Sequence, residues 1–163
     1  MSVAIFPGSF DPITLGHLDV IDRASRMFDR VVVCVMCNSA KQNQMFSADE
    51  RVELILKAVG RYPNVEVRQS SKLLADFARE YEGSVLVKGL RDTADFVYEY
   101  QLDRINKKLN PELDTVFIPA SAEYAYLSST VAREMARYGV DLSAFIPGEI
   151  IEDTENRAKQ WRT

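Results

Sequence analysis

The sequence predicts a doubly wound, Rossmann-like α/β fold, in which a five-stranded parallel sheet is covered by helices on both faces. Short runs of apolar, β-branched residues alternate along the chain with longer segments of helical periodicity. Five such strand-like runs occur, without an internal repeat or low-complexity segment. Strands that alternate with helices form parallel sheets, because each helix returns the chain to the same edge. With 163 residues, we expect a single domain over residues 1–163.

The first elements are indicated by short local patterns. The apolar run Val3–Phe6 predicts a strand, and apolar spacing predicts a helix near Gly16–Phe28. The valine-rich run Arg30–Cys37 predicts the second strand. Ser47, with Glu50 three residues later, forms a capping box that begins the second helix. The later elements are expected to be a strand at Val65–Val67, a helix at Leu73–Tyr81, a strand at Ser84–Val87, a helix from about Ala94 to Leu109, a strand at Thr115–Ile118, a helix capped by Ser128 or Ser129 that ends at Tyr138, and a polar helix from Pro147 onward.

The composition is that of a moderately acidic chain. It has 24 acidic and 20 basic residues and a net charge of −4. This argues against a protein held to nucleic acid by electrostatics, so no nucleic-acid partner is expected. No apolar run approaches transmembrane length, and the N-terminus lacks the charged and apolar regions of an export signal. We therefore expect no membrane contact and a cytoplasmic location.

Two cysteines, Cys34 and Cys37, form a C-x-x-C pattern within a predicted strand. Residues three apart in a strand point to opposite faces, so a disulfide or a shared metal is geometrically unfavourable. We expect two unpaired thiols with no redox role.

The most informative segment is Gly8–His17, which reads G-S-F-D-P-I-T-L-G-H. It joins a strand to a helix, the arrangement in which backbone N–H groups and a helix dipole bind phosphate. Gly8 is expected to allow a tight turn and a close approach of a ligand to the backbone. Pro12 stiffens the loop, and Gly16 removes side-chain bulk just before His17, the only histidine. Such a loop suits a nucleoside triphosphate.

The common nucleotide-binding patterns are absent from the sequence of this loop. It contains neither G-x-G-x-x-G nor G-x-x-x-x-G-K-[ST]. Thr14–His17 reads T-x-G-H, a form of the H-x-G-H motif of nucleotidyltransferases and class I aminoacyl-tRNA synthetases. These four residues fit equally well a helix-start histidine that has no function. The preceding G-S-F-D-P favours the functional interpretation.

Further candidate phosphate-binding groups follow other predicted strands. Lys41 comes after the second strand, Lys88 and Arg91 follow the fourth, and Ser128–Thr130 follows the fifth. Ligands of doubly wound sheets bind at the carboxyl ends of the strands. Most lysines and arginines are merely solvated, but several at one sheet edge predict a site that holds more than one phosphate.

The chain resembles the pantetheine-phosphate adenylyltransferase family of bacterial nucleotidyltransferases over nearly its whole length. The matching motifs are G-S-F-D-P-I-T-x-G-H (8–17), S-x-K (39–41), F-S-x-x-E-R (46–51), G-L-R (89–91), D-F-x-Y-E (95–99) and L-S-S-T-x-x-R (127–133). The first motif is shared in looser form by other nucleotidyltransferases, whereas G-L-R followed by D-F-x-Y-E is more specific. The resemblance implies transfer of the adenylyl group of ATP to 4′-phosphopantetheine, giving dephospho-coenzyme A and pyrophosphate. It also implies Mg²⁺ held mainly by the ATP phosphates, a homohexamer, and coenzyme A as a feedback ligand.

The resemblance further implies roles for individual residues. His17 would stabilise the pentavalent transition state by hydrogen bonding to the α-phosphate. Lys41 and Lys88 would bind the acceptor's phosphate, and no residue is assigned as a metal ligand. The implied ATP site comprises Ser9, Phe10, His17, Gly89, Leu90, Arg91, Glu99, Tyr124, Ala125, Tyr126, Leu127, Ser128, Ser129 and Thr130. The implied acceptor site comprises Ser9, Lys41, Leu74, Lys88, Leu102 and Asn106.

Three positions depart from the family pattern. Lys88 stands where arginine is frequent, which keeps the charge but loses the bidentate fork. The loop 41–46 lacks the expected Lys-Lys-Pro run and is one residue longer. Lys72 stands where an acidic residue is common. These departures concern contacts to the pantetheine arm and not the class of reaction.

The segment 94–109 supports two interpretations. Tyr98, Leu102, Ile105 and Leu109 form an apolar stripe, which by pattern predicts a core-facing surface; the resemblance instead places Leu102 and Asn106 at the acceptor groove. Asp95 and Glu99 lie one helical turn apart and could form a metal pair, but a solvated acidic face is the expectation.

Two other classes of function stay open from the sequence. One is a related transferase that acts on nicotinate mononucleotide or glycerol phosphate, against which the G-L-R and D-F-x-Y-E motifs and the short chain argue. The other is a non-catalytic nucleotide sensor, which would need a phosphate cradle but not His17 at the α-phosphate.

Overall fold

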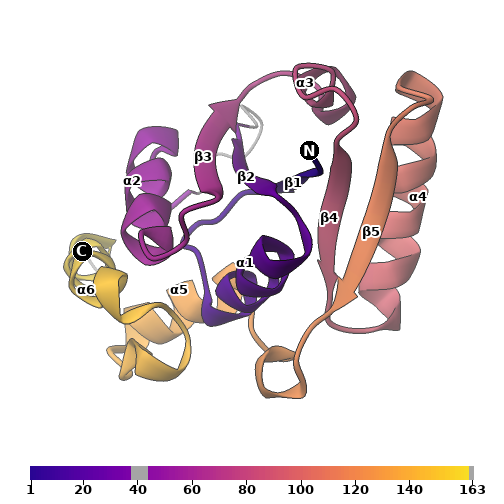
Figure 1. The fold of residues 1–163 in the computed structure, drawn as a ribbon. Helices are drawn as coiled ribbons and strands as arrows, with labels where there is room; N and C mark the ends of the chain where they lie inside the picture. The colour runs from indigo at the N-terminus through magenta and orange to yellow at the C-terminus, as the bar shows by residue number, and fades with distance from the viewer. Residues whose placement is uncertain (38–43, 162–163) are drawn as a thin grey trace.

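The computed structural model describes residues 1–37 and 44–161, in which five strands form one parallel sheet (Figure 1). The strands are β1 (Val3–Gly8), β2 (Arg30–Met36), β3 (Val65–Ser70), β4 (Val85–Leu90) and β5 (Asp114–Pro119). The helices are α1 (Leu15–Met27), α2 (Ala48–Val59), α3 (Leu74–Ala78), α4 (Thr93–Leu109), α5 (Ser129–Tyr138) and α6 (Ile151–Trp161), with short 3₁₀ turns at Ala122–Tyr124, Leu142–Ala144 and Gly148–Ile150.

The order of the strands across the sheet is β3-β2-β1-β4-β5. The chain builds outward from β1 in one direction through β3, then crosses back to build in the other direction from β4. In register, Ile5 of β1 pairs with Val32 on one side and Leu86 on the other. The predicted doubly wound parallel sheet is confirmed, and the switch of direction lies between β1 and β4, where such folds bind ligands.

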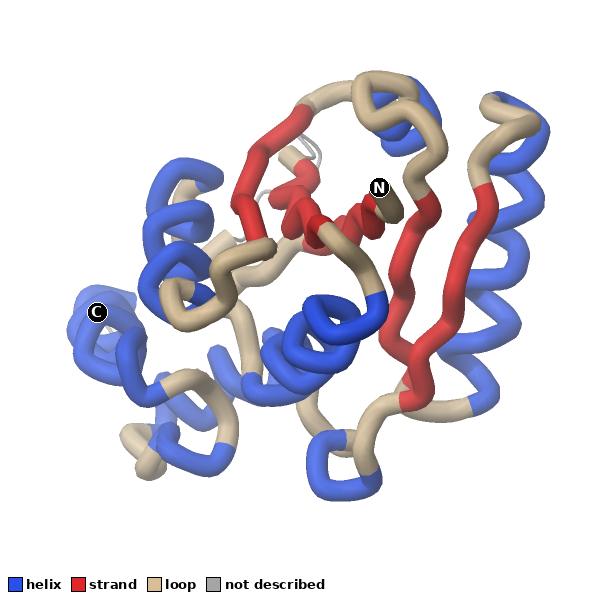
Figure 2. Tube along the Cα trace, viewed as in Figure 1, coloured by secondary structure: helices blue, strands red, loops and turns tan. Residues whose placement is uncertain are grey.

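Two apolar layers lie on the two faces of the sheet, with helices on both sides (Figure 2). Successive residues of β1 alternate between them: Ala4 and Phe6 belong to the larger layer, Val3 and Ile5 to the smaller. The larger layer includes residues of α1, α2, α5 and α6, whereas the smaller includes residues of α3.

The helix starts agree with the capping signals in the sequence. The Ser47 side chain accepts from the Glu50 N–H group, and the Glu50 carboxylate accepts from Ser47 N, which completes the predicted capping box. Of the two serines offered as caps for α5, Ser128 is the N-cap and its hydroxyl accepts from Val131 N.

The structure changes the bounds of several predicted elements; for example, β3, predicted to end at Val67, continues to Ser70. The helix predicted over Leu73–Tyr81 ends at Ala78, because the next N–H groups bond to carbonyls three residues back. β4, predicted to end at Val87, continues to Leu90, because Lys88 to Leu90 pair with Phe117 to Pro119 of β5. Lys88 and Gly89 therefore lie in the strand and not in a following loop.

The prediction that the apolar stripe of α4 faces the core is wrong. No residue of α4 is buried, and Tyr98 and Ile105 are 61% and 55% exposed. The partly buried side of the helix instead contains Asp95, Glu99 and Asn106. The reason is that the interior beside α4 is a polar pocket, described below, and polar side chains turn toward it.

Both cysteines are unpaired, as predicted. Cys34 is buried in β2 beneath the smaller apolar layer. Burial, assisted by Cys37 and Glu80, raises the pKa of the Cys34 thiol to about 12, so it is protonated at neutral pH and is a poor nucleophile.

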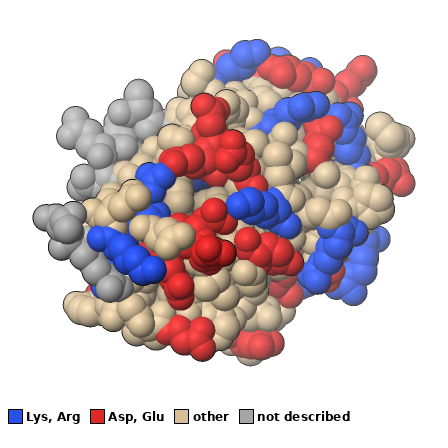
Figure 3. Space-filling view, turned by 90° about the vertical axis from the view of Figure 1, so that its left-hand side faces the viewer, with Lys and Arg blue, Asp and Glu red and all other residues tan. Residues whose placement is uncertain are grey.

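The face formed by α2 and α6 mixes acidic and basic side chains without separating them by sign (Figure 3). Lys57 pairs with Asp153 at 2.8 Å, and Arg157 pairs with Glu50. Exposed pairs of this kind contribute little to stability. Within residues 1–37 and 44–161, no helix has both the length and the apolarity needed to cross a membrane.

Two neighbouring residues of α2 offer a matched test of the core. Ile55 is fully buried, whereas Leu56 is 51% exposed. We expect Ile55→Ala to lower the free energy of unfolding by about 2–5 kcal/mol, because it leaves a cavity in a packed layer. Leu56→Ala should change it by less than about 1 kcal/mol. Urea unfolding followed by circular dichroism measures both, and equal losses would contradict the packing described here.

Candidate active site

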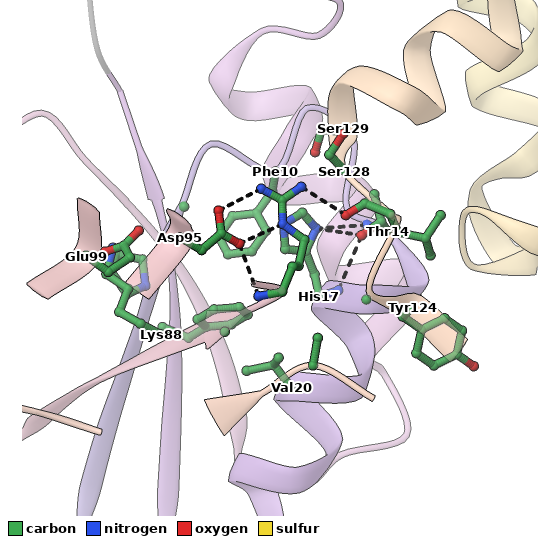
Figure 4. Close-up of a pocket in the computed structure, with 18 residues that line it drawn as sticks. Phe10, Thr14, His17, Val20, Lys88, Asp95, Glu99, Tyr124, Ser128 and Ser129 are labelled. Atoms are coloured by element: carbon green, nitrogen blue, oxygen red, sulfur yellow. Dashed lines mark hydrogen bonds and ion pairs between the residues drawn. The ribbon is translucent and has the colours of Figure 1, made fainter. Parts of the chain in front are cut away.

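A pocket of about 240 Å³ opens at the carboxyl ends of β1 and β4 (Figure 4). In the figure, Lys88 and Glu99 lie at one side and Thr14 and His17 at the other, with Ser128 and Ser129 along the rim. The lining residues are Phe6, Pro7, Gly8, Phe10, Thr14, Gly16, His17, Val20, Lys88, Gly89, Arg91, Asp95, Glu99, Ala120, Tyr124, Leu127, Ser128 and Ser129.

His17 is held by the residue that caps its own helix. Thr14 is the N-cap of α1, and its hydroxyl accepts from the His17 N–H group at 3.3 Å. In return, the Thr14 N–H group donates to His17 Nδ1 at 3.0 Å. A backbone N–H group can only donate, so Nδ1 must carry a lone pair. A neutral His17 therefore carries its proton on Nε2.

His17 is neutral at physiological pH. Desolvation by burial, followed by the positive charge of Arg91, lowers its pKa from 6.5 to about 4. The rings of Phe6 and Phe10 lie against the imidazole, with centroids 6.3 and 5.0 Å away. The ring is thus a hydrogen-bond donor through Nε2 and not a cation.

Phe10 adopts an unusual backbone conformation. Its φ is 48°, the left-handed region that costs a non-glycine residue roughly 1–3 kcal/mol. Its ring fills the space beside Gly8, where a Cβ atom would lie 2.9 Å from Phe10 Cζ. Gly8 lines the pocket, and its lack of a side chain also makes room for the Phe10 ring; its own φ is not positive. A close approach of a ligand to the Gly8 backbone stays a prediction.

Arg91 is held by Asp95, one helical turn away. Arg91 Nε and Nη2 donate to the two carboxylate oxygens at 2.8 and 3.0 Å, and Arg91 N donates at 3.1 Å. These hydrogen bonds hold the pKa of Asp95 below its ordinary value. Arg91 Nη1 also donates to Leu127 O at 3.3 Å, which ties the first turn of α4 to the loop before α5.

Lys88 and Glu99 form the second ion pair of the pocket. Lys88 Nζ lies 3.1 Å from Glu99 Oε2, and both side chains are largely buried. The contact is not aligned as a hydrogen bond, so Oε2 has no hydrogen-bond donor among the described residues. We therefore regard the pair as electrostatic and incompletely satisfied. Asp95 and Glu99 were expected on a solvated face; both instead turn toward pocket cations.

Two helices point their N-termini at the pocket. Gly16 and His17 come from the first turn of α1, and Ser128 and Ser129 from the start of α5. The positive ends of these helix dipoles favour an anion. Ser129 Oγ donates to Pro12 O at 2.8 Å, which fastens the start of α5 to the Gly8–His17 loop.

The structure brings together most of the residues predicted to form the site. Of the eighteen described positions in the predicted ATP and acceptor sets, those that line the pocket are Phe10, His17, Lys88, Gly89, Arg91, Glu99, Tyr124, Leu127, Ser128 and Ser129. Ser9, Leu90, Ala125, Tyr126 and Thr130 do not line the pocket but are next in sequence to residues that do. Leu74, Leu102 and Asn106 do not line it. Lys41 lies outside the described residues.

Leu102 and Asn106 continue the partly buried side of α4 that begins with Asp95 and Glu99, and α3, which carries Leu74, packs against this helix. Leu102 and Asn106, two of the predicted acceptor residues, thus follow Glu99 along α4, and Leu74 lies on the helix that packs against α4. Lys72, where the family pattern differs, is exposed and pairs with Glu80.

Several lining residues were not predicted. Asp95 and Thr14 belong to motifs that the sequence displays, D-F-x-Y-E and T-x-G-H, so a signal was present for both. Phe6, Pro7, Val20 and Ala120 line the pocket through ordinary apolar positions, and no pattern in the sequence distinguishes them.

These features define a nucleotidyltransferase: a neutral histidine, two cations and two helix N-termini around a cavity at the switch point of a parallel sheet. The cytidylyltransferase-like family model matches residues 5–135. The chain belongs, within that class, to the phosphopantetheine adenylyltransferase family.

Relatives of that name match the chain almost end to end. The protein from Clostridium tetani is 50% identical over 153 residues, covering 94% of this chain and 95% of the relative. That from Clostridium perfringens is 46% identical over 162 residues, covering 99% and 98%. A solved structure of a Vibrio parahaemolyticus protein assigned as a nicotinate-nucleotide adenylyltransferase superposes with a TM-score of 0.71 at 19% identity, covering 96% and 95% of the two chains, which confirms the fold.

The titration of His17 is directly measurable, because the chain has one histidine. In NMR spectra of the folded protein we expect its imidazole resonances to titrate near pH 4, with urea-unfolded protein titrating near 6.5 as the reference. Between these values the unfolded chain binds a proton that the folded chain does not. His17 therefore makes the protein less stable as the pH falls from about 6.5 toward 4. A folded-state midpoint near 6.5 would contradict the burial described here.

Proposed function

We propose that the protein transfers the adenylyl group of ATP to 4′-phosphopantetheine, giving 3′-dephospho-coenzyme A and pyrophosphate in coenzyme A biosynthesis. The observation that supports this best is His17: a neutral Nε2–H donor at the N-terminus of α1, beside Arg91 and Lys88. Membership of the phosphopantetheine adenylyltransferase family supports the choice of acceptor.

The reaction is a direct in-line displacement. A phosphate oxygen of 4′-phosphopantetheine, already ionised, attacks the α-phosphorus of ATP. The new P–O bond forms as the bond between the α-phosphorus and the bridging oxygen to the β-phosphate breaks, and pyrophosphate leaves. The enzyme needs neither a nucleophile nor a general base, which fits a pocket whose groups are hydrogen-bond donors and cations. Its contribution is positioning and stabilisation of charge.

His17 is the residue that we place at the reacting centre. Its Nε2–H group donates to a non-bridging oxygen of the α-phosphate, where charge develops in the transition state. The ATP site comprises Ser9, Phe10, Gly89, Leu90, Arg91, Glu99 and residues 124–130. The acceptor site comprises Ser9, Lys41, Leu74, Lys88, Leu102 and Asn106. Arg91 and the N-terminus of α5 bind the ATP phosphates, and Lys88 binds the acceptor's phosphate.

Mg²⁺ enters as part of the substrate, bound to the phosphates of ATP. This fits the donor set, because the two pocket carboxylates, Asp95 and Glu99, are each engaged by a cation. Phosphate oxygens and water then supply most of the ligands that a magnesium ion prefers.

The assembly, regulation and location follow from the family resemblance. We propose a homohexamer, which the outward apolar side of α4 supports: Phe96, Val97, Tyr98, Tyr100 and Ile105 are all exposed there. Coenzyme A, which contains the pantetheine arm of the acceptor, is proposed as a feedback ligand. A cytoplasmic location stays a prediction.

The product of the reaction tests the proposed function. Protein, ATP and Mg²⁺ are mixed with 4′-phosphopantetheine, nicotinate mononucleotide or glycerol phosphate in turn, and the products are weighed by mass spectrometry. We expect dephospho-coenzyme A and pyrophosphate from the first acceptor alone. His17→Ala should fold normally and lower kcat by about two to three orders of magnitude, the scale for loss of one transition-state donor. Near-normal turnover in this variant would exclude the role of His17, and transfer to another acceptor would exclude the proposed substrate.

The division of the site between two substrates predicts opposite effects for its two cations. Arg91→Ala should weaken ATP more than 4′-phosphopantetheine, and Lys88→Gln should do the reverse, each by about ten- to hundredfold for its own ligand. Isothermal titration with each ligand measures this. The control is Lys57→Gln, because Lys57 is ion-paired outside the pocket. Equal losses for both ligands in each variant would show that the division is wrong.

A further inference from the structure

Phe10 is the one non-glycine residue with a positive φ in the described part of the chain. Its neighbours' carbonyl groups are each bound by an arginine from a different helix. Arg51 of α2 donates to Ser9 O at 2.7 Å, and Arg133 of α5 donates to Asp11 O at 2.6 Å. The strained residue is therefore held on both sides by guanidinium groups.

Arg51 is unusual because it is fully buried, with 1% of its surface exposed. Besides Ser9 O, its guanidinium donates to Ser47 O at 3.3 Å and Gln44 Oε1 at 3.2 Å. All three acceptors are neutral, and no carboxylate pairs with it among the described residues. Burying a charge without a counter-charge is costly. We therefore attribute the buried position of Arg51 to the need to hold the carbonyl groups that it binds.

Arg133 acts on a residue that is fixed at several other points. The Asp11 carboxylate accepts from Met45 N and Phe46 N, both at 2.9 Å, and lies 3.6 Å from Arg133 Nη1. Arg133 Nη2 reaches Thr130 Oγ1 at 3.2 Å. The guanidinium thus joins α5 to the loop through Nη1, while Nη2 is held within α5.

Because peptide groups are planar, the contact to the Ser9 carbonyl also affects the backbone of Phe10. The Ser9 carbonyl and the Phe10 N–H group share one plane and point in opposite directions, so a carbonyl fixed by Arg51 also fixes the direction of that N–H group. Arg133 acts one peptide further on, because Asp11 O belongs to the Asp11–Pro12 peptide. The two contacts together restrain the chain before and after Phe10, whose ring lies beside Gly8 and edge-on to His17. Neither arginine lines the pocket itself.

We propose that Arg51 and Arg133 are positioning residues, which hold Phe10 in its left-handed conformation and thereby hold the His17 imidazole in its donating orientation. As a statement about catalysis this rests on the proposed function. As a statement about the free protein it does not, because the state of the only histidine can be observed without substrate.

The test uses Arg51→Lys and Arg133→Lys in the full chain. Lysine keeps the charge but offers no planar fork, so it cannot serve the same acceptors together. We expect kcat to fall about ten- to hundredfold, as for a small misplacement at a reacting centre, with KM for ATP changing by less than about threefold. In the free protein, the imidazole ¹⁵N shifts should lose the Nε2–H pattern, and the His17 titration should move from about 4 toward 6.5 as water reaches the ring.

The matched control is Arg79→Lys. Arg79 also donates to a backbone carbonyl, Leu109 O at 2.6 Å, and also pairs with a carboxylate, that of Asp76, but outside the pocket. Its loss should leave kcat and the His17 spectrum unchanged. In Gly8→Ala the new methyl group displaces the Phe10 ring directly, so this variant should reproduce the changes in the His17 spectrum. It tests whether Phe10 positions His17 even if Arg51→Lys does not fold.

The proposal is overturned if folded Arg133→Lys and Gly8→Ala keep the wild-type His17 titration, whatever their activity. It is also overturned if activity falls only with the folded fraction. If the wild-type protein forms no dephospho-coenzyme A, the proposed function fails, while the spectra of the free variants still decide whether the two arginines position His17.

Discussion

The hydrogen bond from the Thr14 N–H group to Nδ1 of His17 sets the chemistry of the pocket. It requires an unprotonated Nδ1, so the neutral ring has one donor left, Nε2–H, for a ligand. Protonation of Nδ1 would place two N–H groups against each other, which adds to the effects of burial and of Arg91 on the pKa. A neutral donor can strengthen its hydrogen bond as charge develops on the α-phosphate, without adding a third cation that would also hold the ground state and the products.

Each of the two pocket cations is paired with a carboxylate. Asp95 holds Arg91 through three hydrogen bonds, whereas Glu99 holds Lys88 through a contact that leaves Oε2 without a hydrogen-bond donor among the described residues. An incompletely satisfied buried pair is the easier one to rearrange, because less hydrogen bonding is lost. We infer that Lys88 turns to a substrate phosphate more readily than Arg91, which fits the assignment of Lys88 to the acceptor and Arg91 to a scaffold for the nucleotide.

The sequence predicted the fold from local signals, whereas most of the pocket was predicted from the family resemblance. β-Branched runs, capping boxes and the T-x-G-H motif each act over a few residues, so β1, α1 and His17 were found without tertiary information. The Phe10 conformation was not predicted, nor was the role of Arg51 and Arg133, although both stand at the ends of motifs that the sequence displays, F-S-x-x-E-R and L-S-S-T-x-x-R. Arg51 lies 42 residues from Ser9 and Arg133 lies 122 residues from Asp11, the residues whose carbonyls they bind, and no local pattern reveals such distant contacts. The neighbour of Gly8 was not predicted for the same reason: the ring that lies where a Gly8 side chain would be belongs to a residue two positions away, which distant contacts hold there.

The helix α4 turns its acidic side chains toward the pocket and its apolar side chains toward the surface. Periodicity identifies an apolar stripe, and the rule that this stripe faces inward presumes an apolar interior. Here the interior beside α4 is lined by Lys88 and Arg91, so Asp95 and Glu99 turn inward to pair with them. The same rotation carries Leu102 and Asn106 along one side, in line with the pocket, and leaves Tyr98 and Ile105 exposed. One requirement, the pairing of two cations, therefore turns one side of α4 toward the pocket and leaves an apolar exterior of the kind that marks contacts between proteins.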